Sequence, residues 1–391
     1  MKKNNDDVNE IDIEEGLKHI EGIIKDQIER CSQMESLRNM MDRDINYDKT
    51  KITVGLIGGD GIGPIIMKET SRILGKLLSD EIAEEKIELK EISGLTLENR
   101  IDKNETVPSE VLSEMRRCDV VLKGPTTTPS EGENNLESAN VFLRREFDLF
   151  ANVRPVRIES EGIDWTFFRE NTEGEYALGS KGLSIGDKFS IDFKVTTDEG
   201  TRRIAKSAFE FAKKNHKKRV TIVTKANIMK KTDGDFLRIC KEVGANYPGI
   251  EVDSRFVDIM AANLINKEER NKFEVIILPN LYGDIITDEA AEIQGGVGTA
   301  GSANVGSRYA IFEAIHGSAP RMVKQGLSDK ANPASLLKAA SMMLEHLGYY
   351  EKARMLEKAI SEADRIIGHR MSGLRDGASC KDYANMVLTN I

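Results

Sequence analysis

The chain has few cysteines and lacks the spacings that would join them into a disulfide framework or a zinc site. Its four cysteines are scattered along 391 residues and form no CxxC pair. No stretch approaches the ~18 consecutive apolar residues of a membrane-spanning helix. The first residues are polar and contain no apolar signal core. These absences favour a reduced, cytoplasmic protein with no membrane segment.

Positive charge is also not in excess. The formal net charge is −9, and lysines and arginines form no continuous basic stripe, so a nucleic-acid partner is not expected. Apolar residues make up 39% of the chain and charged residues 31%, a balance typical of a folded globular protein. An anionic substrate would therefore need a local group of arginines.

Short apolar strands alternate with helical stretches along the body of the chain. Strands are expected at 52–57, 120–122, 220–223 and 275–278, and helices at 66–78, 201–215, 231–243 and 286–293. This alternation predicts an α/β fold with substantial parallel pairing. From Pro333 onward the chain is expected to be mostly helical.

Residues 1–50 are expected to form a separate helical extension with a polar linker. Between residues 11 and 44, apolar side chains recur every three or four positions: Ile13, Leu17, Ile20, Ile24, Ile28, Cys31 and Met34. Such a stripe must be buried against something. The body of the protein and a partner copy are both open alternatives.

A glycine-rich turn follows the first expected strand. The segment Gly59-Asp60-Gly61-Ile62-Gly63 lacks the G-x-G-x-x-G spacing of a Rossmann dinucleotide site. Pro64 comes next and suits the first turn of a helix. We therefore expect a tight strand-to-helix turn near a ligand rather than a Rossmann fingerprint.

Two carboxylates in LYGDIITD are candidate metal ligands. Asp284 and Asp288 are four residues apart and would share a helix face, in what is expected to be a first turn. Such a pair suits a hard divalent cation, although acidic residues at a helix start can also simply favour the helix dipole. Asp258 lies among apolar neighbours and needs a partner if buried, and Lys225 follows a strand, where it suits proton transfer.

A group of polar and cationic residues could bind an anionic substrate. Asn140 and Arg144 would share a helix face, and Arg154 and Arg169 stand in or beside apolar stretches. Guanidinium groups bind carboxylates with two parallel hydrogen bonds; structural ion pairing is the alternative. Ser138 could add a hydroxyl or could simply cap the helix.

Taken together, these segments resemble the isocitrate and isopropylmalate dehydrogenase family of β-decarboxylating dehydrogenases. The resemblance begins near residue 51 and rests on motifs in the right order: GGDGIGP, KGPTTTP, SANVFLRREFDLFANVRP, RENTEGEY, KANIMK, LYGDIITDEAAEIQGG, AIHGSAP and ANP. It implies an α/β fold unlike the Rossmann domain. Residues 51–150 and 300–391 would form a large cofactor-side domain, and 151–299 a small domain with dimer-interface elements.

The resemblance also implies roles for individual residues in a homodimer or higher homo-oligomer with shared active sites. Proton transfer would use Tyr176, Lys225 and Asp258. The substrate would be bound by Ser138, Asn140, Arg144, Arg154, Arg169 and Asn227. NAD or NADP would lie against Thr127, Asn280, His316, Gly317, Ser318, Ala319, Arg321 and Asn332. Mg²⁺ or Mn²⁺ would be held by Asp284, Asp288 and Asp258, and the partner subunit would supply Lys225, Asn227 and Asp258.

The polar pair at 138 and 140 indicates the substrate. Isocitrate members of the family are similar here, whereas isopropylmalate members carry apolar residues. The resemblance thus implies oxidative decarboxylation of isocitrate to 2-oxoglutarate and CO₂, a step of the tricarboxylic acid cycle. Isopropylmalate, homoisocitrate and a non-catalytic regulatory subunit are the alternatives. The cofactor stays open, because Arg321 and Met322 match neither the Asp of NAD-linked relatives nor the Lys-Tyr of NADP-linked ones.

Overall fold

A ten-stranded mixed sheet runs through the protein, in the order β2-β1-β3-β12-β11-β4-β5-β10-β8-β9. The computed structural model describes residues 10–38, 51–128, 136–179, 181–296 and 300–391. The strands of this sheet are β1 Ile52–Ile57, β2 Ile87–Glu91, β3 Val120–Lys123, β4 Ala151–Ile158, β5 Ile163–Glu170, β8 Arg219–Thr224, β9 Glu251–Phe256, β10 Val275–Leu278, β11 Gly301–Val305 and β12 Ala310–Ala314. A separate hairpin pairs β6 Leu183–Ile185 with β7 Phe189–Ile191.

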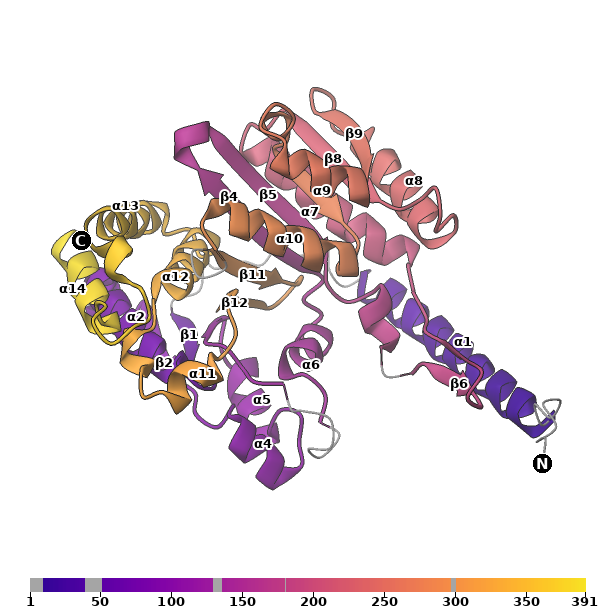
Figure 1. Cartoon of the computed structure of the whole chain (residues 1–391), viewed down its shortest axis with the longest axis horizontal. Helices are drawn as coiled ribbons and strands as arrows, with labels where there is room; N and C mark the ends of the chain where they lie inside the picture. Colours follow the sequence, from indigo (N-terminus) through magenta and orange to yellow (C-terminus); the bar gives the residue numbers. More distant parts are fainter. Residues whose placement is uncertain (1–9, 39–50, 129–135, 180, 297–299) are drawn as a thin grey trace, which may run out of the picture.

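Helices cover both faces of the sheet (Figure 1). They are α1 Glu10–Arg38, α2 Gly63–Leu77, α3 Ser79–Ala83, α4 Leu97–Lys103, α5 Ser109–Arg116, α6 Ala139–Glu146, α7 Asp198–Lys214, α8 Thr232–Gly244, α9 Val257–Ile265, α10 Asn280–Gln294, α11 Pro320–Lys324, α12 Ala334–His346, α13 Tyr350–Ile367 and α14 Cys380–Thr389. The predicted α/β fold is confirmed, and the chain beyond Pro333 is mostly helical as expected.

Parallel pairing dominates the two ends of the sheet and antiparallel pairing its middle. The neighbours β2-β1-β3-β12 and β5-β10-β8-β9 are parallel, whereas β12-β11-β4-β5 are antiparallel. The four strands expected from apolar runs are β1, β3, β8 and β10. The expectation of parallel strands is therefore confirmed, and the antiparallel centre is a feature that local patterning did not indicate.

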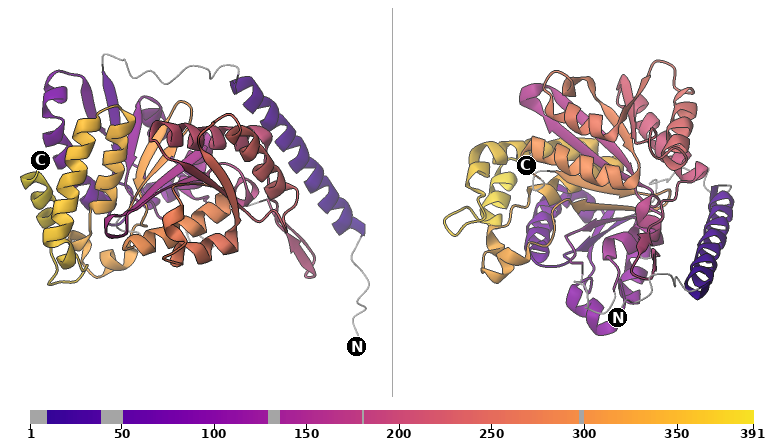
Figure 2. Two further views of the ribbon diagram at one scale, coloured as in Figure 1. Left: turned by 90° about the horizontal axis from the view of Figure 1, so that it is seen from above. Right: turned by 45° about the vertical axis from the view of Figure 1, so that its right-hand side comes forward.

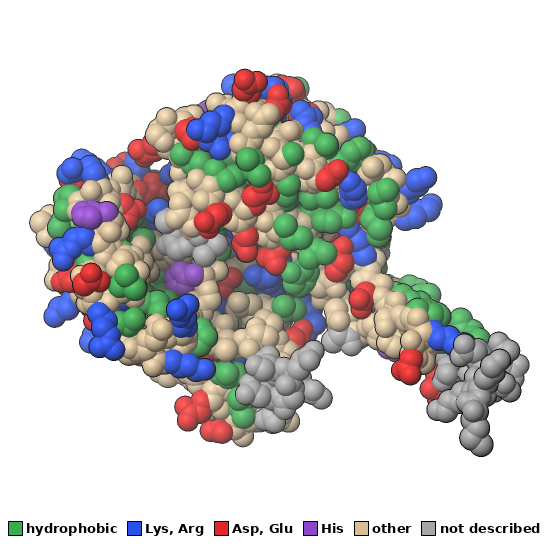
Figure 3. Space-filling view, viewed as in Figure 1, with side chains coloured by type: hydrophobic (Ala, Val, Ile, Leu, Met, Phe, Trp, Pro, Cys, Tyr) green, Lys and Arg blue, Asp and Glu red, His purple; other side chains and the backbone are tan. Residues whose placement is uncertain are grey.

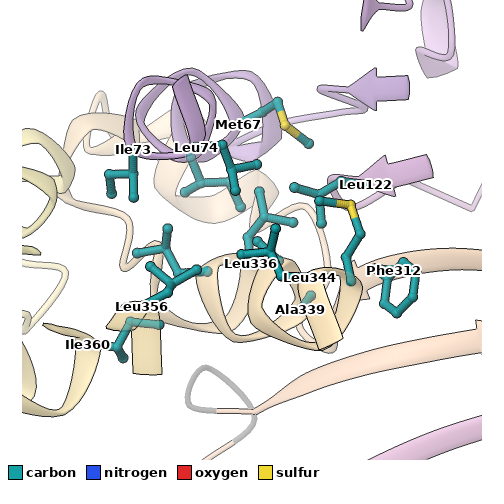
Figure 4. Packing of buried hydrophobic residues seen from close by; sticks show 14 of the residues in the cluster. Met67, Ile73, Leu74, Leu122, Phe312, Leu336, Ala339, Leu344, Leu356 and Ile360 are labelled. Atoms are coloured by element: carbon teal, nitrogen blue, oxygen red, sulfur yellow. The ribbon is translucent and has the colours of Figure 1, made fainter. Parts of the chain in front are cut away.

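The largest core lies where helices α2, α12, α13 and α14 pack on the β1-β3-β12 end of the sheet (Figure 4). Helix α2 begins directly after the glycine-rich turn, with Pro64 in its first turn. Its inner face presents Ile66, Ile73 and Leu74, which are fully buried. Each such side chain stabilises the fold by about 1.5–3 kcal/mol through burial.

The other end of the sheet is sandwiched between two helix pairs. Successive residues of β10 point to opposite faces, so that Ile276 packs with α9 and α10 while Ile277 packs with α7 and α8. Because one continuous sheet links both ends, the division into two domains stays a prediction. None of the described helices is long and apolar enough to cross a membrane, and a cytoplasmic location stays a prediction as well.

The N-terminal helix α1 lies beside the β6-β7 hairpin, on the opposite side of the molecule from the C-terminal helices (Figures 1 and 2). It contacts β6 and α7. Ile23, which is outside the predicted stripe, is the buried side chain, whereas Leu17 and Ile28 are 61% and 62% exposed. Ile13 and Ile24 are exposed as well, whereas Ile20 and Cys31 are half-buried. The exposed part of the stripe does not face the body, and its burial against a partner copy stays a prediction. Residues 39–44 of the expected helix lie outside the described residues.

Candidate active site

The glycine-rich turn joins three loops at one end of the sheet. Gly61 has a positive φ of 62°, and a Cβ there would collide with the carbonyl oxygen of Ser318, so only glycine fits without strain. The Ile62 N–H donates to that same carbonyl oxygen at 3.1 Å. The Asp60 carboxylate accepts from the Thr127 N–H at 2.7 Å. The predicted strand-to-helix turn is confirmed, and it fixes the loops that carry Thr127 and Ser318.

A polar pocket of about 110 Å³ lies beside these loops. It is lined by Pro125, Thr126, Asn140, Arg144, Arg154, Ser302, Glu313, Ala314, Ile315, His316 and Gly317. Asn140 and Arg144 of α6 and Arg154 of β4 were predicted to bind the substrate. In this pocket they meet His316 and Gly317 of the loop after β12, which were predicted to bind the cofactor.

Several buried nitrogen atoms of this pocket lack partners. Within the described part of the chain, Arg144 Nε, Arg154 Nε and His316 Nε2 make no hydrogen bond. Buried donors without acceptors are costly. Burial lowers the pKa of His316, which favours its neutral ring. A ligand with several carboxylate oxygens would supply the acceptors that the two arginines lack.

Next to the pocket, two carboxylates of α10 are held by arginines and a tyrosine. Arg154 Nη1 donates to Asp288 Oδ1 at 2.8 Å, and Arg169 pairs with Asp284. The Tyr176 hydroxyl donates to Asp284 Oδ2 at 2.7 Å. Burial opposes ionisation of Asp284, but Arg169 and this hydrogen bond hold its pKa below the usual value. The cluster therefore gathers two carboxylates beside Arg154, which lines the pocket.

The position of these carboxylates within α10 corrects the expectation. They were predicted in the first turn, but α10 begins at Asn280, so that no acidic residue lies in its first turn. Pro279 ends the preceding strand segment, and its carbonyl oxygen accepts the first helical hydrogen bond from Gly283. Asp284 and Asp288 still share a face. Hard oxygen donors one turn apart fit Mg²⁺ or Mn²⁺, but the described ranges of a single chain contain no cluster of three potential ligands.

Asp258 lies elsewhere in the chain and is paired with Lys225. Lys225 Nζ lies 2.5 Å from Asp258 Oδ1, and the aspartate side chain is 59% exposed. In the single chain Asp258 is therefore a surface residue in the first turn of α9. The hydrogen bond to Lys225 lowers its pKa. Asn227 is exposed in the loop after β8.

The residues indicated for the cofactor separate into two groups. Thr127 Oγ1 and Ser318 Oγ are hydrogen-bonded at 2.7 Å, beside the pocket residue His316. Asn332 Oδ1 instead accepts from the N–H of Ala334, the first residue of α12. Ala319 is half-buried, and Arg321 is exposed on α11.

Asn280 is buried away from the pocket, and both ends of its amide are engaged. Its Oδ1 accepts from Arg169 Nε at 3.0 Å, and its Nδ2 donates to the Glu173 carbonyl oxygen at 3.0 Å. We therefore interpret Asn280 as a residue that orients Arg169, since its side chain does not line the pocket.

A comparison with known protein families matches residues 53–387 to the family described as isocitrate/isopropylmalate dehydrogenase. The chain belongs to this family. The predicted resemblance is thus confirmed, and helix α1 lies outside the matched range.

Individual relatives are similar over most of the chain. The NADP isocitrate dehydrogenase of Rickettsia prowazekii is 41% identical over 79% of this chain and 62% of that protein, so the chain spans less than two thirds of it. The mitochondrial subunit alpha of NAD isocitrate dehydrogenase from Macaca fascicularis is 37% identical over 87% of this chain and 95% of that protein. The crystal structure of isocitrate dehydrogenase from Methylococcus capsulatus is 32% identical, with a TM-score of 0.76 over 87% of this chain and 99% of that one.

Sequence reasoning missed a buried ion pair whose carboxylate, that of Glu313, lines the pocket. Lys123 Nζ lies 2.9 Å from Glu313 Oε2, and Arg144 lies 3.8 Å from the other carboxylate oxygen. Burial opposes ionisation of Glu313, but Lys123 and Arg144 lower its pKa to about 2. The missed signal was a carboxylate inside the apolar strand β12, between Phe312 and Ala314. The Glu313 carboxylate thus partly compensates the positive charge of Arg144, whose side chain lines the pocket.

Proposed function

We propose that the protein catalyses the oxidative decarboxylation of isocitrate to 2-oxoglutarate and CO₂ with reduction of NAD or NADP. One observation carries this proposal: a polar pocket brings Asn140, Arg144 and Arg154 together with the His316 loop, directly beside the two carboxylates of α10. The names of the relatives agree with this chemistry.

The substrate would be held by its carboxylates. The side chains of Arg144 and Arg154 are 13% and 8% exposed, and each has a nitrogen without a partner among the described residues. Ser138 occupies the N-cap position of α6, but its side chain makes no capping hydrogen bond, which leaves the hydroxyl for a ligand. An isopropyl group against Ser138 and Asn140 would leave polar groups unpaired, which disfavours isopropylmalate.

Asp284 and Asp288, with Asp258 of the partner subunit, would hold Mg²⁺ or Mn²⁺. The bound ion supplies Lewis-acid chemistry, which acidifies a hydroxyl and stabilises negative charge on oxygen. Tyr176, whose hydroxyl already points to Asp284, would deliver a proton to the substrate carbon after decarboxylation. Lys225 with Asp258 would accept the hydroxyl proton, and Arg169, held by Asn280, would orient a carboxylate.

The active sites are proposed to be shared in a homodimer. Two features support this arrangement: Lys225 and Asp258 pair with each other apart from the α10 carboxylates, and hydrophobic side chains gather over α9 and α10 (Figure 3). Ile259, Ile265 and Ile285 on these helices are 46%, 66% and 58% exposed. Exposed apolar patches of this kind mark interaction surfaces.

The proposal is tested by initial rates of the purified chain alone. Isocitrate and isopropylmalate are each supplied with Mg²⁺ and with either NAD or NADP, and nicotinamide reduction and CO₂ release are measured. We expect turnover of isocitrate and little or none of isopropylmalate. Efficient oxidation of isopropylmalate would contradict the substrate assignment. No turnover of either would favour a non-catalytic subunit; one relative, from Dictyostelium discoideum, is named a regulatory subunit.

A further inference from the structure

An arginine of helix α1 reaches the segment that carries the active-site tyrosine. Arg30 Nη2 lies 3.4 Å from Glu173 Oε1 and 3.4 Å from the Thr172 carbonyl oxygen. Gln27, one turn earlier, accepts from Arg30 Nη1 at 3.3 Å and orients the guanidinium. The arginine side chain is 26% exposed, and the glutamate side chain is 3% exposed. A helix outside the family match thus contacts a buried part of the family fold.

The Glu173 carboxylate lies in a confined space that already contains negative charge. Its oxygens accept from the Thr197 N–H and hydroxyl, and a Cβ at Gly200 would collide with them. Glu170 lies close by and accepts from the Glu173 N–H. Burial and the Glu170 carboxylate raise the pKa of Glu173 to about 7, and Arg30 opposes this rise.

Cations face this acidic pair from two elements. Arg203 of α7 lies near both carboxylates. Burial lowers the pKa of Arg203, but Asp148, Glu170 and Glu173 together raise it above the usual value. Arg203 Nη2 also donates to the Thr172 hydroxyl at 3.3 Å. Its strongest ion pair is with Asp148, at 2.6 Å. Among the described residues, Arg30 is the only cation that forms an ion pair with the Glu173 carboxylate. Without Arg30, the buried Glu173 carboxyl would either carry a charge with no ion-pair partner or take up a proton, and both outcomes disturb this confined site.

A continuous set of hydrogen bonds joins this segment to the proposed chemistry. The Glu173 carbonyl oxygen accepts from Asn280, whose Oδ1 accepts from Arg169 Nη2 at 2.7 Å. Arg169 pairs with Asp284, which also accepts from the Tyr176 hydroxyl. Displacement of the backbone at Glu173 would therefore shift a proposed substrate ligand and the proposed proton donor together.

We propose that Arg30 is a positioning residue of the active site, through which helix α1 holds the 172–173 backbone so that Asn280, Arg169 and Tyr176 keep their places. The expected effect on catalysis rests on the proposed function, whereas the expected effect on the backbone of this segment does not. Helix α1, which lies outside the family match, would then stabilise the backbone that positions active-site residues of the family fold.

The kinetic test compares Arg30→Ala and Arg30→Lys with Lys25→Ala, in the full chain. Lys25 is a matched control on α1, because its ion pair with Glu21 is exposed on both sides. We expect Arg30→Ala to lower kcat/KM for isocitrate roughly three- to tenfold, with the KM for the nicotinamide cofactor within about twofold of the original. Arg30→Lys should recover part of the loss, and Lys25→Ala should have no effect. Equal kinetics of Arg30→Ala and Lys25→Ala would overturn the inference.

Two further measurements separate positioning from general destabilisation and from failure of the proposed function. If Arg30 acts by compensating Glu173, the double variant Arg30→Ala/Glu173→Gln should be less impaired than Arg30→Ala, because the buried group is then neutral. Hydrogen exchange needs no substrate: Arg30→Ala should speed exchange in a peptide spanning residues 169–178, and Lys25→Ala should not. If the chain does not turn over isocitrate but exchange changes as expected, the proposed function fails and the positioning role stands. Unchanged exchange contradicts the role itself.

Discussion

At the residue scale, Asp284 is where the proposed substrate-binding, acid–base and metal roles converge. It contacts Arg169 and Tyr176 and lies 3.8 Å from Arg154. We expect Asp284→Asn to lower kcat/KM by roughly 100-fold and to weaken the Mg²⁺ dependence, because a neutral amide is a poorer ligand for a hard cation. Rates measured over a Mg²⁺ titration check this, with circular dichroism to confirm folding.

The matched control is Glu292→Gln, which makes the same charge change on the exposed side of α10. It should leave the Mg²⁺ dependence as it is. Full activity of the natural protein in excess chelator would exclude a metal role for Asp284 and Asp288 altogether.

Arg321 is the residue at which the cofactor preference can be tested. It is exposed on the short helix α11, directly after the His316 loop. A guanidinium there can pair with a 2′-phosphate, whereas an aspartate would repel it. We expect NADP not to be strongly excluded, and Arg321→Asp to shift the ratio of kcat/KM values toward NAD by roughly tenfold.

Both cofactors are measured on both proteins, with Lys324→Asp as the control because it places the same charge on the same helix. If kcat/KM of the natural protein is already lower for NADP than for NAD by orders of magnitude, and Arg321→Asp does not change this ratio, Arg321 does not contact the adenosine ribose or its 2′-phosphate.

At the scale of elements, the turn between β1 and α2 links the core to the cofactor-side loops. Gly61→Ala would place a methyl group against the Ser318 carbonyl oxygen at a positive φ. We expect a loss of about 1–3 kcal/mol in the free energy of unfolding and a higher KM for the nicotinamide cofactor, because the Ser318 loop must move. Thermal melting and cofactor titration measure the two effects.

Gly75→Ala is the matched control, since it lies in the same helix, α2, and a Cβ there would meet nothing within 4 Å. Alanine favours the helix interior, so this variant should be more stable by up to about 1 kcal/mol. Equal changes in the free energy of unfolding for Gly61→Ala and Gly75→Ala would show that the turn accommodates a Cβ at position 61 without strain.

At the scale of the whole molecule, the proposed sharing of active sites predicts complementation between chains. Lys225→Ala and Tyr176→Phe should each be nearly inactive. In a mixed dimer, one of the two sites receives an intact Tyr176 from one chain and an intact Lys225 from the other, so about half of the natural activity per dimer should return. Mixing each variant with itself is the control, and verified heterodimers that stay inactive would count against sharing.

Much of the site could be anticipated because its signals are local. The strands β1 and β10 are continuous apolar runs, and the turn after β1 is defined by glycines and Pro64 within a few residues. Arg154 stands out because a cation in an apolar strand needs an anion, and the structure does place it between Asp288 and the pocket. Binding roles for these residues stay predictions, since they depend on ligands.

What the sequence alone determined is therefore the fold class, the family and the identity of the polar residues that converge, because periodicity and motif order are carried by neighbouring residues. Only the tertiary structure decided which partners those residues find. The buried pair of Lys123 with Glu313 joins strands that are far apart in the chain, and Asp258 turned out to be an exposed partner of Lys225. The same holds for α1, where four side chains of the apolar stripe are exposed while Arg30 reaches Glu173. Burial and charge compensation are set by contacts across the fold, which no local pattern contains.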